Sequence, residues 1–342
     1  MPSIFDVARR AQVAIGTVSR VINGDRHVAT ETRKRVLAAV RALDYRPNPA
    51  ARSLRTKRTH LIALTLPELA NPFYASIVEG VQKELEAADY HLILCGPPTS
   101  PAPEPRYLEL LAARHVDGLI VSSRRLSCDD KVSRELARLG QEGHPIVWLG
   151  GPPKASPLAF DCVYCDTTQG IRQAMLHLLS LGHRRVAYFG PPKGVVENRL
   201  QTCREVLAAH KVNASVSQVF RDEPTLESGF KMAELLLKAA SRPTAVLAVN
   251  DVVAIGAMMA FQEHGIAVPD EISVIGIDDL PLASLVRPTL TTVSQPKDEL
   301  GKLGARRLLD RLGGRIQKFE ILTLPTQLIV RSSTSSPKCV PT

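Results

Sequence analysis

The sequence of 342 residues lacks any run of about 18 consecutive apolar residues, which is roughly what an α-helix needs to cross a bilayer. Its first residues, Met-Pro-Ser-Ile-Phe-Asp, also lack the basic start and apolar run of a secretory signal peptide. Hydrophobic residues nevertheless make up 44% of the chain, which suffices for packed cores. We therefore expect a soluble, cytoplasmic protein of more than one domain, with no membrane partner.

Familiar catalytic motifs are missing as well. The sequence contains no GxGxxG, GxxxxGK[ST], GxSxG or HExxH pattern, which are signatures of dinucleotide, nucleotide, ester-hydrolysing and zinc-peptidase sites. The glycine and proline residues at 190–194 do not have the spacing that cradles a phosphate. We expect no enzymatic activity, no catalytic residue and no cofactor.

The six cysteines do not form the dense array of a disulfide-stabilised secreted domain. Two of them have CxxC spacing, but neither a second CxxC nor a histidine pair completes a metal site. We interpret this CxxC as part of an apolar strand with two free thiols, and we expect no bound metal. The cysteines are Cys95, Cys128, Cys162, Cys165, Cys203 and Cys339.

Positive charge is concentrated at one end of the chain. Residues 1–60 contain 13 Lys and Arg but only 4 Asp and Glu, whereas the other 282 residues contain 30 of each sign. The whole net charge of +9 therefore lies in this first segment. A concentrated basic segment attracts nucleic-acid phosphates and releases their counterions, although such a segment can also be a solvated surface.

Three short helices are predicted in the basic segment. Ser3 and Asp6 have the spacing of a capping box, and apolar residues recur at helical intervals over residues 4–11. A second helix over about 15–22 follows a tight turn, and a third begins near Thr30. This is the pattern of a helix-turn-helix, whose second helix can enter the major groove of DNA. The inward residues of the second and third helices would be Val18, Val21, Ile22, Val36, Val40 and Leu43.

Residues 6–54 resemble the DNA-binding headpiece and hinge of the LacI/GalR family, that of the lactose and purine repressors: DVARRAQVAIGTVSRVINGDRHVATETRKRVLAAVRALDYRPNPAARSL. The resemblance implies a sequence-specific transcriptional regulator, a repressor, that binds double-stranded DNA. One departure is Ala14, where the family usually has a serine that caps the second helix. The positions that contact DNA in the family are Ile15, Gly16 and Arg20 for base edges, Thr17 and Ser19 for phosphates, and also Asn23.

Residues 47–59 resemble the family's hinge. Asn48-Pro49 is a favourable helix start, but a helix of about seven residues is marginal alone, so we expect it to fold on DNA. Leu54 takes the position of a leucine that wedges a base step open in the minor groove, with Ala51 and Arg55 beside it on the DNA. Alternatively, Leu54 packs against protein.

From residue 60 onward, apolar segments of strand length alternate with segments of helical spacing. We therefore expect an α/β fold: a three-helix headpiece and hinge helix, then two doubly wound parallel-sheet subdomains. A ligand cleft is expected at the carboxyl ends of their strands. The expected strands are 61–66, 91–95, 118–122, 146–149, 186–189, 245–249 and 272–277, and the expected helices are 74–88, 170–181, 227–239 and 252–264.

Motifs in this region resemble the family's regulatory core, which is akin to periplasmic sugar-binding proteins. They are NPFY at 71–74, HVDGLIV at 115–121, LGHRRVAYFGPP at 181–192, PTAVLAVND at 243–251, ISVIGIDDLP at 272–281 and RPTLTTVSQP at 287–296. The resemblance implies a small-molecule effector, a sugar or related metabolite, and polar residues suited to its hydroxyl groups. Any of these residues could instead be structural, for example as a helix cap. The effector-binding positions are Phe73, Arg199, Asn250 and Asp278.

Three departures from the family point to an atypical ligand, or even to none. Gly150 replaces a frequent aspartate, Glu223 stands near a frequent pocket aromatic, and Thr202 replaces a common glycine. A sugar stays the leading expectation because it is the family's commonest effector class.

The expected domains are a helix-turn-helix over 1–46, a hinge over 47–59, an effector-binding core over 60–334 and a tail over 335–342. Within the core we expect an N-subdomain of about 60–160 and 292–322 and a C-subdomain of about 161–291 and 323–334. The tail has no heptads for a coiled coil, so we expect a homodimer on a pseudo-palindromic operator. The alternative is a sugar receptor with no regulatory role, which the basic segment disfavours.

Overall fold

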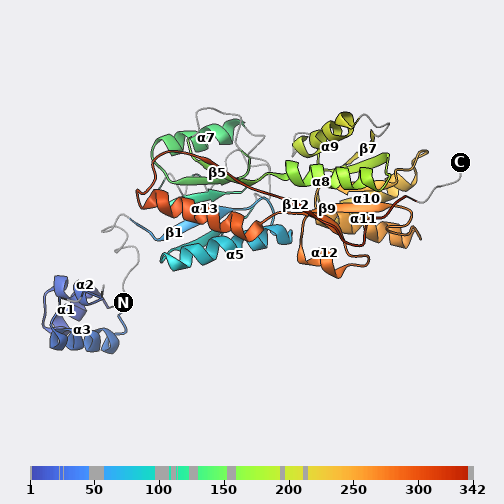
Figure 1. Ribbon diagram of the computed structural model, residues 1–342. Helices are drawn as coiled ribbons and strands as arrows, with labels where there is room; N and C mark the ends of the chain where they lie inside the picture. Colours follow the sequence, from blue (N-terminus) through green and yellow to red (C-terminus); the bar gives the residue numbers. More distant parts are fainter. Residues whose placement is uncertain are drawn as a thin grey trace. The chain divides into compact units, whose positions relative to one another are not determined.

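The computed structural model divides into two compact units, residues 1–60 and residues 61–342, which we call the headpiece and the core (Figure 1). The predicted DNA contacts Asn23, Ala51, Leu54 and Arg55, and with them most of the predicted hinge, lie outside the residues that the structure describes. The described residues are 2–22, 24–25, 27–45, 58–96, 108, 113, 115–122, 130–151, 159–192, 197–210 and 215–337.

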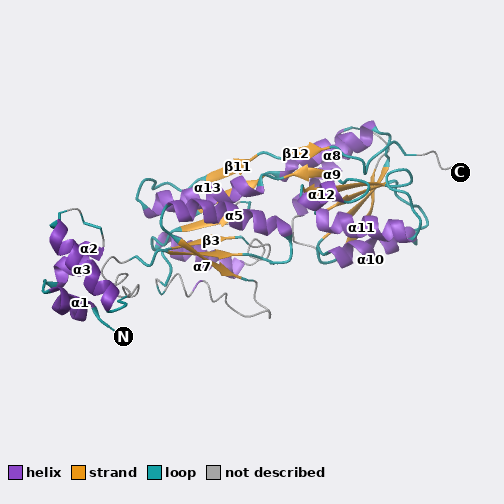
Figure 2. Cartoon of the chain, turned by 90° about the horizontal axis from the view of Figure 1, so that it is seen from below, coloured by secondary structure: helices purple, strands orange, loops and turns teal. Residues whose placement is uncertain are grey.

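In its described residues the headpiece has three helices around a small core (Figure 2). They are α1 (Ile4–Ala11), α2 (Ile15–Ile22) and α3 (Thr30–Ala42), as the sequence predicts. The capping box of α1 is present, since the Ser3 side chain accepts from the Asp6 amide and Asp6 accepts from the Ser3 amide at 2.9 Å. Ala39 rather than Val40 is the second fully buried residue of α3, because Val40 and Leu43 lie at the edge of the core.

The first sheet of the core is parallel throughout and has the strand order β11-β5-β4-β3-β1-β2. One face packs on α5 and α13 and the other on α7, so apolar side chains are buried on both faces. The strands are β1 (Leu61–Thr65), β2 (His91–Cys95), β3 (Gly118–Val121), β4 (Ile146–Leu149), β5 (Asp161–Cys165) and β11 (Ile321–Leu324). The helices are α5 (Pro72–Ala87), α7 (Asp130–Gln141) and α13 (Lys297–Leu312).

The second sheet has the order β12-β10-β9-β8-β6-β7 and is parallel except for the pair β10 and β12. Helices α10 and α11 cover one face, and α8 and α9 cover the other. The strands are β6 (Arg185–Gly190), β7 (Ser215–Arg221), β8 (Ala245–Ala248), β9 (Ser273–Asp278), β10 (Thr291–Ser294) and β12 (Gln327–Ile329). The helices are α8 (Thr167–Ser180), α9 (Glu197–Ala209), α10 (Leu226–Leu237), α11 (Asp251–Glu263) and the short α12 (Pro281–Leu285).

The chain passes between the two sheets three times, after β5, after β10 and after β11. The expected subdomain boundaries at 160, 291 and 322 therefore need correction by a few residues. Strand β5 belongs to the first sheet because it pairs with β4 and β11, and its Asp161 accepts hydrogen bonds from Arg307 and Arg311 of α13. Strand β10 belongs to the second sheet, next to β9.

The CxxC segment forms β5 and carries two free thiols, as predicted. Cys162 is buried in the cluster beneath α7, whereas Cys165 packs against the opposite cluster beneath α5 and α13. The two thiols therefore lie on opposite faces of the sheet. Burial raises the pKa of both thiols to about 12, which keeps them protonated at neutral pH.

Candidate functional site

Helix α2 exposes the face that the sequence assigns to DNA. Val18 and Val21 are buried in the headpiece core, whereas Ile15, Gly16 and Arg20 are exposed. Thr17 and Ser19 are partly exposed at the margins of this face. The helix starts with hydrogen bonds from the Thr17 and Val18 amides to the carbonyl of Ala14, whose side chain has no acceptor for a cap.

Gly16 is not required by the packing of the headpiece. A Cβ built at this position meets nothing within 4 Å, so a side chain would extend into open space. The glycine therefore removes a possible base contact from the exposed face of α2 without a compensating contact inside the headpiece.

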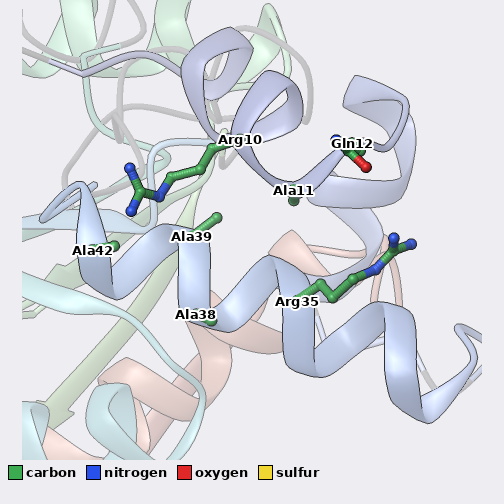
Figure 3. A pocket seen from close by; sticks show the side chains of 7 residues that line it. All are labelled: Arg10, Ala11, Gln12, Arg35, Ala38, Ala39 and Ala42. Carbon is green, nitrogen blue, oxygen red and sulfur yellow. The ribbon is translucent and has the colours of Figure 1, made fainter.

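A shallow hollow lies elsewhere on the headpiece, between the end of α1 and α3 (Figure 3). Alanines of α3 form its floor, and the side chains of Arg10 and Arg35 extend at its opposite ends. None of its lining residues comes from α2. The two arginines add positive charge to the headpiece outside the exposed α2 face that the sequence assigns to DNA.

The core contains a cavity of about 480 Å³ at the carboxyl ends of strands from both sheets, where the sequence predicts the effector site. Aromatic rings and polar side chains line it together, which is typical of small-molecule sites. Its lining residues are Phe73, Tyr74, Ile77, Ser122, Trp148, Leu149, Gly150, Gly151, Tyr164, Cys165, Asp166, Thr167, Thr168, Asn198, Arg199, Gln295 and Leu300.

Two of the four predicted effector residues line this cavity. Phe73 lies at the start of α5, with its ring edge-on to that of Tyr74 at 5.2 Å between centroids. Arg199 lies near the start of α9 and donates to the carbonyl oxygen of Val249. Sequence resemblance thus places one aromatic and one cationic group at the cavity.

Asn250 is not among the lining residues. Its side-chain oxygen accepts from the Val253 amide at 2.9 Å and caps α11, and its amide nitrogen lies 3.4 Å from the carbonyl oxygen of Pro224. These contacts fit the alternative that the sequence left open, in which a polar residue at a strand end caps the next helix.

Asp278 is also not among the lining residues and is buried at the end of β9. Its Oδ1 accepts a hydrogen bond of 2.6 Å from Gln295, which does line the cavity. Burial, followed by the nearby Asp251 carboxylate, raises the pKa of Asp278 to about 8, while Arg199 and Lys297 oppose the shift. The carboxyl group is therefore mostly protonated at neutral pH.

The raised pKa of Asp278 predicts how the stability of the folded protein depends on pH. Because the folded pKa of Asp278 lies above its ordinary value, its contribution to stability is complete below about pH 4 and is lost as the pH rises through about 8. The variant Asp278→Asn, which keeps an acceptor for Gln295, should lose less stability than the parent between about pH 5 and pH 8, by on the order of 2 kcal/mol. Urea unfolding at a series of pH values measures the difference.

Asp298→Asn is a matched control, because this exposed carboxyl has a pKa below its ordinary value, chiefly through its hydrogen bond from Lys302. Its charge does not change over the same pH range. Parallel stability curves for the parent and Asp278→Asn would contradict the assignment of a raised pKa to Asp278.

The structure also adds cavity residues that sequence reasoning does not find. Trp148 and Gln295 line the cavity, and Asp166 caps α8 at its edge by accepting from the Thr168 amide at 2.9 Å. Trp148 stands two residues before Gly150, the position where the sequence departs from the family. That departure is the one signal in the sequence that points to this wall of the cavity.

No group of three or more metal-ligating side chains occurs among the described residues. Within the same parts of the chain, none of the helices has both the length and the apolar character needed to cross a membrane.

Comparison with known proteins assigns the chain to a family. Residues 3–48 match the bacterial regulatory proteins of the lacI family, and residues 175–334 match a periplasmic binding protein-like domain. Over 336 residues the chain is 34% identical to the HTH-type transcriptional regulator DegA of Bacillus subtilis, covering 97% of this chain and 98% of DegA. The chain belongs to the lacI family of bacterial regulatory proteins.

Solved structures agree with this assignment. The lac repressor dimer bound to operator and the anti-inducer ONPF matches this lacI-family chain with a TM-score of 0.86 and 29% identity, covering 98% of this chain and 99% of that one. A complex of the transcriptional regulator CelR with cellobiose matches with a TM-score of 0.73 and 34% identity, covering 97% and 100%. The lacI-family chain is therefore a helix-turn-helix transcriptional regulator with a periplasmic binding protein-like core.

Proposed function

We propose that this lacI-family regulator is a cytoplasmic repressor that binds a pseudo-palindromic operator as a homodimer, and that a small metabolite in the core cavity, a sugar or related compound, controls its affinity for DNA. The observation that carries the proposal is the presence in one chain of an exposed α2 face and a cavity of about 480 Å³ lined by aromatic and polar side chains. The metabolite is bound and released unchanged.

The DNA contacts follow from the exposed face of α2. Arg20 binds a guanine through O6 and N7, and Ile15 makes an apolar contact with a base edge. Gly16 lies against its base pair without a side-chain contact, while Thr17 and Ser19 contact phosphates. Asn23 and the hinge residues Ala51, Leu54 and Arg55 complete the DNA contacts, with Leu54 as the minor-groove wedge.

The effector contacts are divided between direct and indirect ones. Phe73 covers an apolar face of the ligand, and Arg199 binds its polar groups, because both line the cavity. Asp278 acts on the ligand through Gln295, to which it is hydrogen-bonded, and Asn250 positions the start of α11. The chain is divided into the helix-turn-helix, the hinge and the two-sheet core. The ligand binds between the two sheets of the core, and its binding controls the spacing of the two hinges of the dimer.

Two copies of the chain meet through an apolar surface that includes α12. This helix of five residues buries only Ala283 and leaves Leu282 45% and Leu285 67% exposed. Met259 of α11 and Leu235 of α10 are also exposed. Large exposed apolar side chains on adjoining elements are typical of subunit interfaces, and α10 packs on α11.

Leu285→Asp should therefore convert the dimer into a monomer, because it places a charge in the apolar contact. Sedimentation velocity would measure a halved mass, and operator affinity should fall because one recognition helix no longer accompanies the other. The matched control is Leu176→Asp on α8, an exposed leucine outside this surface. Equal masses for Leu285→Asp and the parent would contradict the interface.

The experiment that tests the function is selection of duplexes from a random-sequence pool by the full-length chain. A regulator enriches a palindromic site, and its affinity for that site falls steeply, on the order of 10³-fold, between about 50 and 200 mM salt because phosphate contacts release counterions. A candidate metabolite that binds the core should then change the affinity. A sugar receptor, the alternative function, would enrich no sequence and show no such dependence on salt.

A further inference from the structure

Trp148, the only tryptophan in the sequence, has a hydrogen-bond donor without an acceptor at the wall of the cavity. Its side chain belongs to β4, is 1% exposed, and stacks on Phe160 with 6.1 Å between ring centroids. Within the described residues, no oxygen or nitrogen accepts a hydrogen bond from its Nε1–H. A buried N–H without an acceptor is costly, so such a group at a cavity indicates a missing partner.

Gly150 is the cavity residue whose missing side chain faces this N–H. A Cβ at position 150 would lie 2.5 Å from Nε1 of Trp148 and 3.2 Å from its Cδ1, which is too close for any side chain without a shift of the ring. Gly150 itself lines the cavity. Because position 150 has no side chain, the indole nitrogen can lie directly against the backbone of a residue that lines the cavity.

The charged groups of the cavity favour a ligand that accepts hydrogen bonds. Arg199 donates to the Val249 carbonyl, and in the described part of the chain no carboxylate forms an ion pair with it. Among the described residues that line the cavity, Asp166 is the one with a carboxylate, and its Oδ1 accepts from the Thr168 amide. Asp278 is buried, and its hydrogen bond from Gln295 makes it a poor partner for ligand hydroxyl groups.

Helix orientation adds to the positive potential. The first residues of three helices, α5, α8 and α9, line the cavity, so the positive ends of their dipoles point toward it. Arg199 adds a lining cation to this potential, and the Trp148 N–H adds a donor without an acceptor.

We propose that the effector is an anion, a metabolite that carries a carboxylate or phosphate group, and that Arg199 binds the charged group while Trp148 donates its Nε1–H to an acceptor oxygen of the same ligand. Trp148 is then a specificity-determining residue, and neutral sugars lack the charge that this site selects. The proposal rests on the proposed function in one respect, since it takes this cavity as the effector site.

The test uses full-length protein labelled with ¹⁵N in tryptophan, which gives a single indole N–H signal. Metabolites are offered as matched sets, each with one neutral member and its carboxylate and phosphate derivatives, for example glucose, gluconate and glucose 6-phosphate. We expect compounds that raise the melting temperature to be anions and to shift the indole signal. The carboxylate and phosphate arms distinguish the two sources of charge.

Trp148→Phe keeps an aromatic ring that can stack on Phe160 but removes the Nε1–H donor. It should therefore weaken binding of the anion that raises the melting temperature by about tenfold or more. Tyr188→Phe is the matched control, because it removes another buried donor without a partner, from a residue outside the lining of the cavity. This variant should bind the anion as the parent does. Circular dichroism verifies that both variants are folded.

Two outcomes would overturn the proposal: none of the anions raises the melting temperature, whether or not a neutral compound does, or Trp148→Phe and the parent bind the anion with equal affinity. Operator binding separates this proposal from the proposed function. An anion that binds through Trp148 without changing operator affinity contradicts effector control but not the anion site. A neutral compound that changes operator affinity contradicts the anion site and leaves the regulator function intact.

Discussion

Arg20→Ala should weaken binding to the selected operator by about 30-fold to 20 000-fold while changing affinity for a scrambled duplex only slightly. A bidentate arginine contact to guanine contributes about 1–3 kcal/mol to discrimination, and a homodimer makes it twice. Arg20 is on the exposed face of α2, one residue before the buried Val21, so its removal does not disturb the headpiece core. Fluorescence anisotropy at one fixed salt concentration measures both affinities.

Arg10→Ala provides the matched control for Arg20. This exposed arginine of α1 lines the hollow of Figure 3 and lies outside the α2 face that the sequence assigns to DNA. Its loss removes the same charge and should reduce binding to operator and scrambled duplex by similar, small factors. If Arg20→Ala and Arg10→Ala lost affinity equally on both duplexes, base recognition by Arg20 would be wrong.

Asp161→Asn should destabilise the core by about 3–5 kcal/mol, because it removes the buried negative charge shared by two largely buried guanidinium groups, and of these Arg307 keeps its pair with Glu320. The Asp161 carboxylate is fully buried and accepts from Arg307 Nε at 2.9 Å, from Arg311 Nε at 2.8 Å and from the Glu320 amide at 3.0 Å. These contacts connect β5, α13 and the residue before β11. Urea unfolding of the full-length protein gives the free energy of unfolding.

Glu135→Gln is the control for this ion cluster. Glu135 pairs with Arg138 one turn away on the exposed side of α7, where solvent screens the interaction. Surface pairs of this kind contribute about 0–1 kcal/mol, so this variant should unfold almost as the parent does. A similar small loss for Asp161→Asn would indicate that solvent reaches the buried carboxylate and that the cluster adds little to the stability of the core.

Much of the fold follows from local sequence, and the exceptions have physical causes. Strands such as β8 and β9 are continuous apolar runs because both faces of a parallel sheet are buried, and the sequence predicts them within a residue or two. Strand β10 (Thr-Thr-Val-Ser) is short and mostly polar, and β12 (Gln-Leu-Ile) has only three residues, so neither is predicted. Their pairing partners, not their own composition, make them strands.

Helix α13 is missed for a different reason. Helix α13 has long charged side chains interrupted by glycines. Gly301 is needed because a Cβ there would lie 2.3 Å from the carbonyl oxygen of Ile77 on α5. A glycine within a helical segment lowers the helical signal in the sequence, yet here it permits two helix backbones to approach closely. This requirement depends on tertiary contacts that the sequence does not display.

The effector cavity is only partly predictable for a similar reason. Phe73 and Arg199 stand in segments similar to those of the family, and the structure brings both to the cavity. The partner of Asp278, in contrast, is Gln295 on the far side of β10, 17 residues away in the sequence. Trp148 belongs to no recognised motif, and its position depends on the missing side chain of Gly150, because a Cβ there would collide with the indole. Such roles depend on neighbours in space.

The three passages between the sheets have a consequence for how this protein can be recombined. The junction between the headpiece and the core lies at residues 60–61, so one genetic crossover suffices to join this core to another DNA-binding headpiece. Each sheet, however, is assembled from separate stretches of the gene that alternate along the core. No single crossover can therefore replace one half of the core, and new operator specificities can be acquired more simply than a new half of the ligand site.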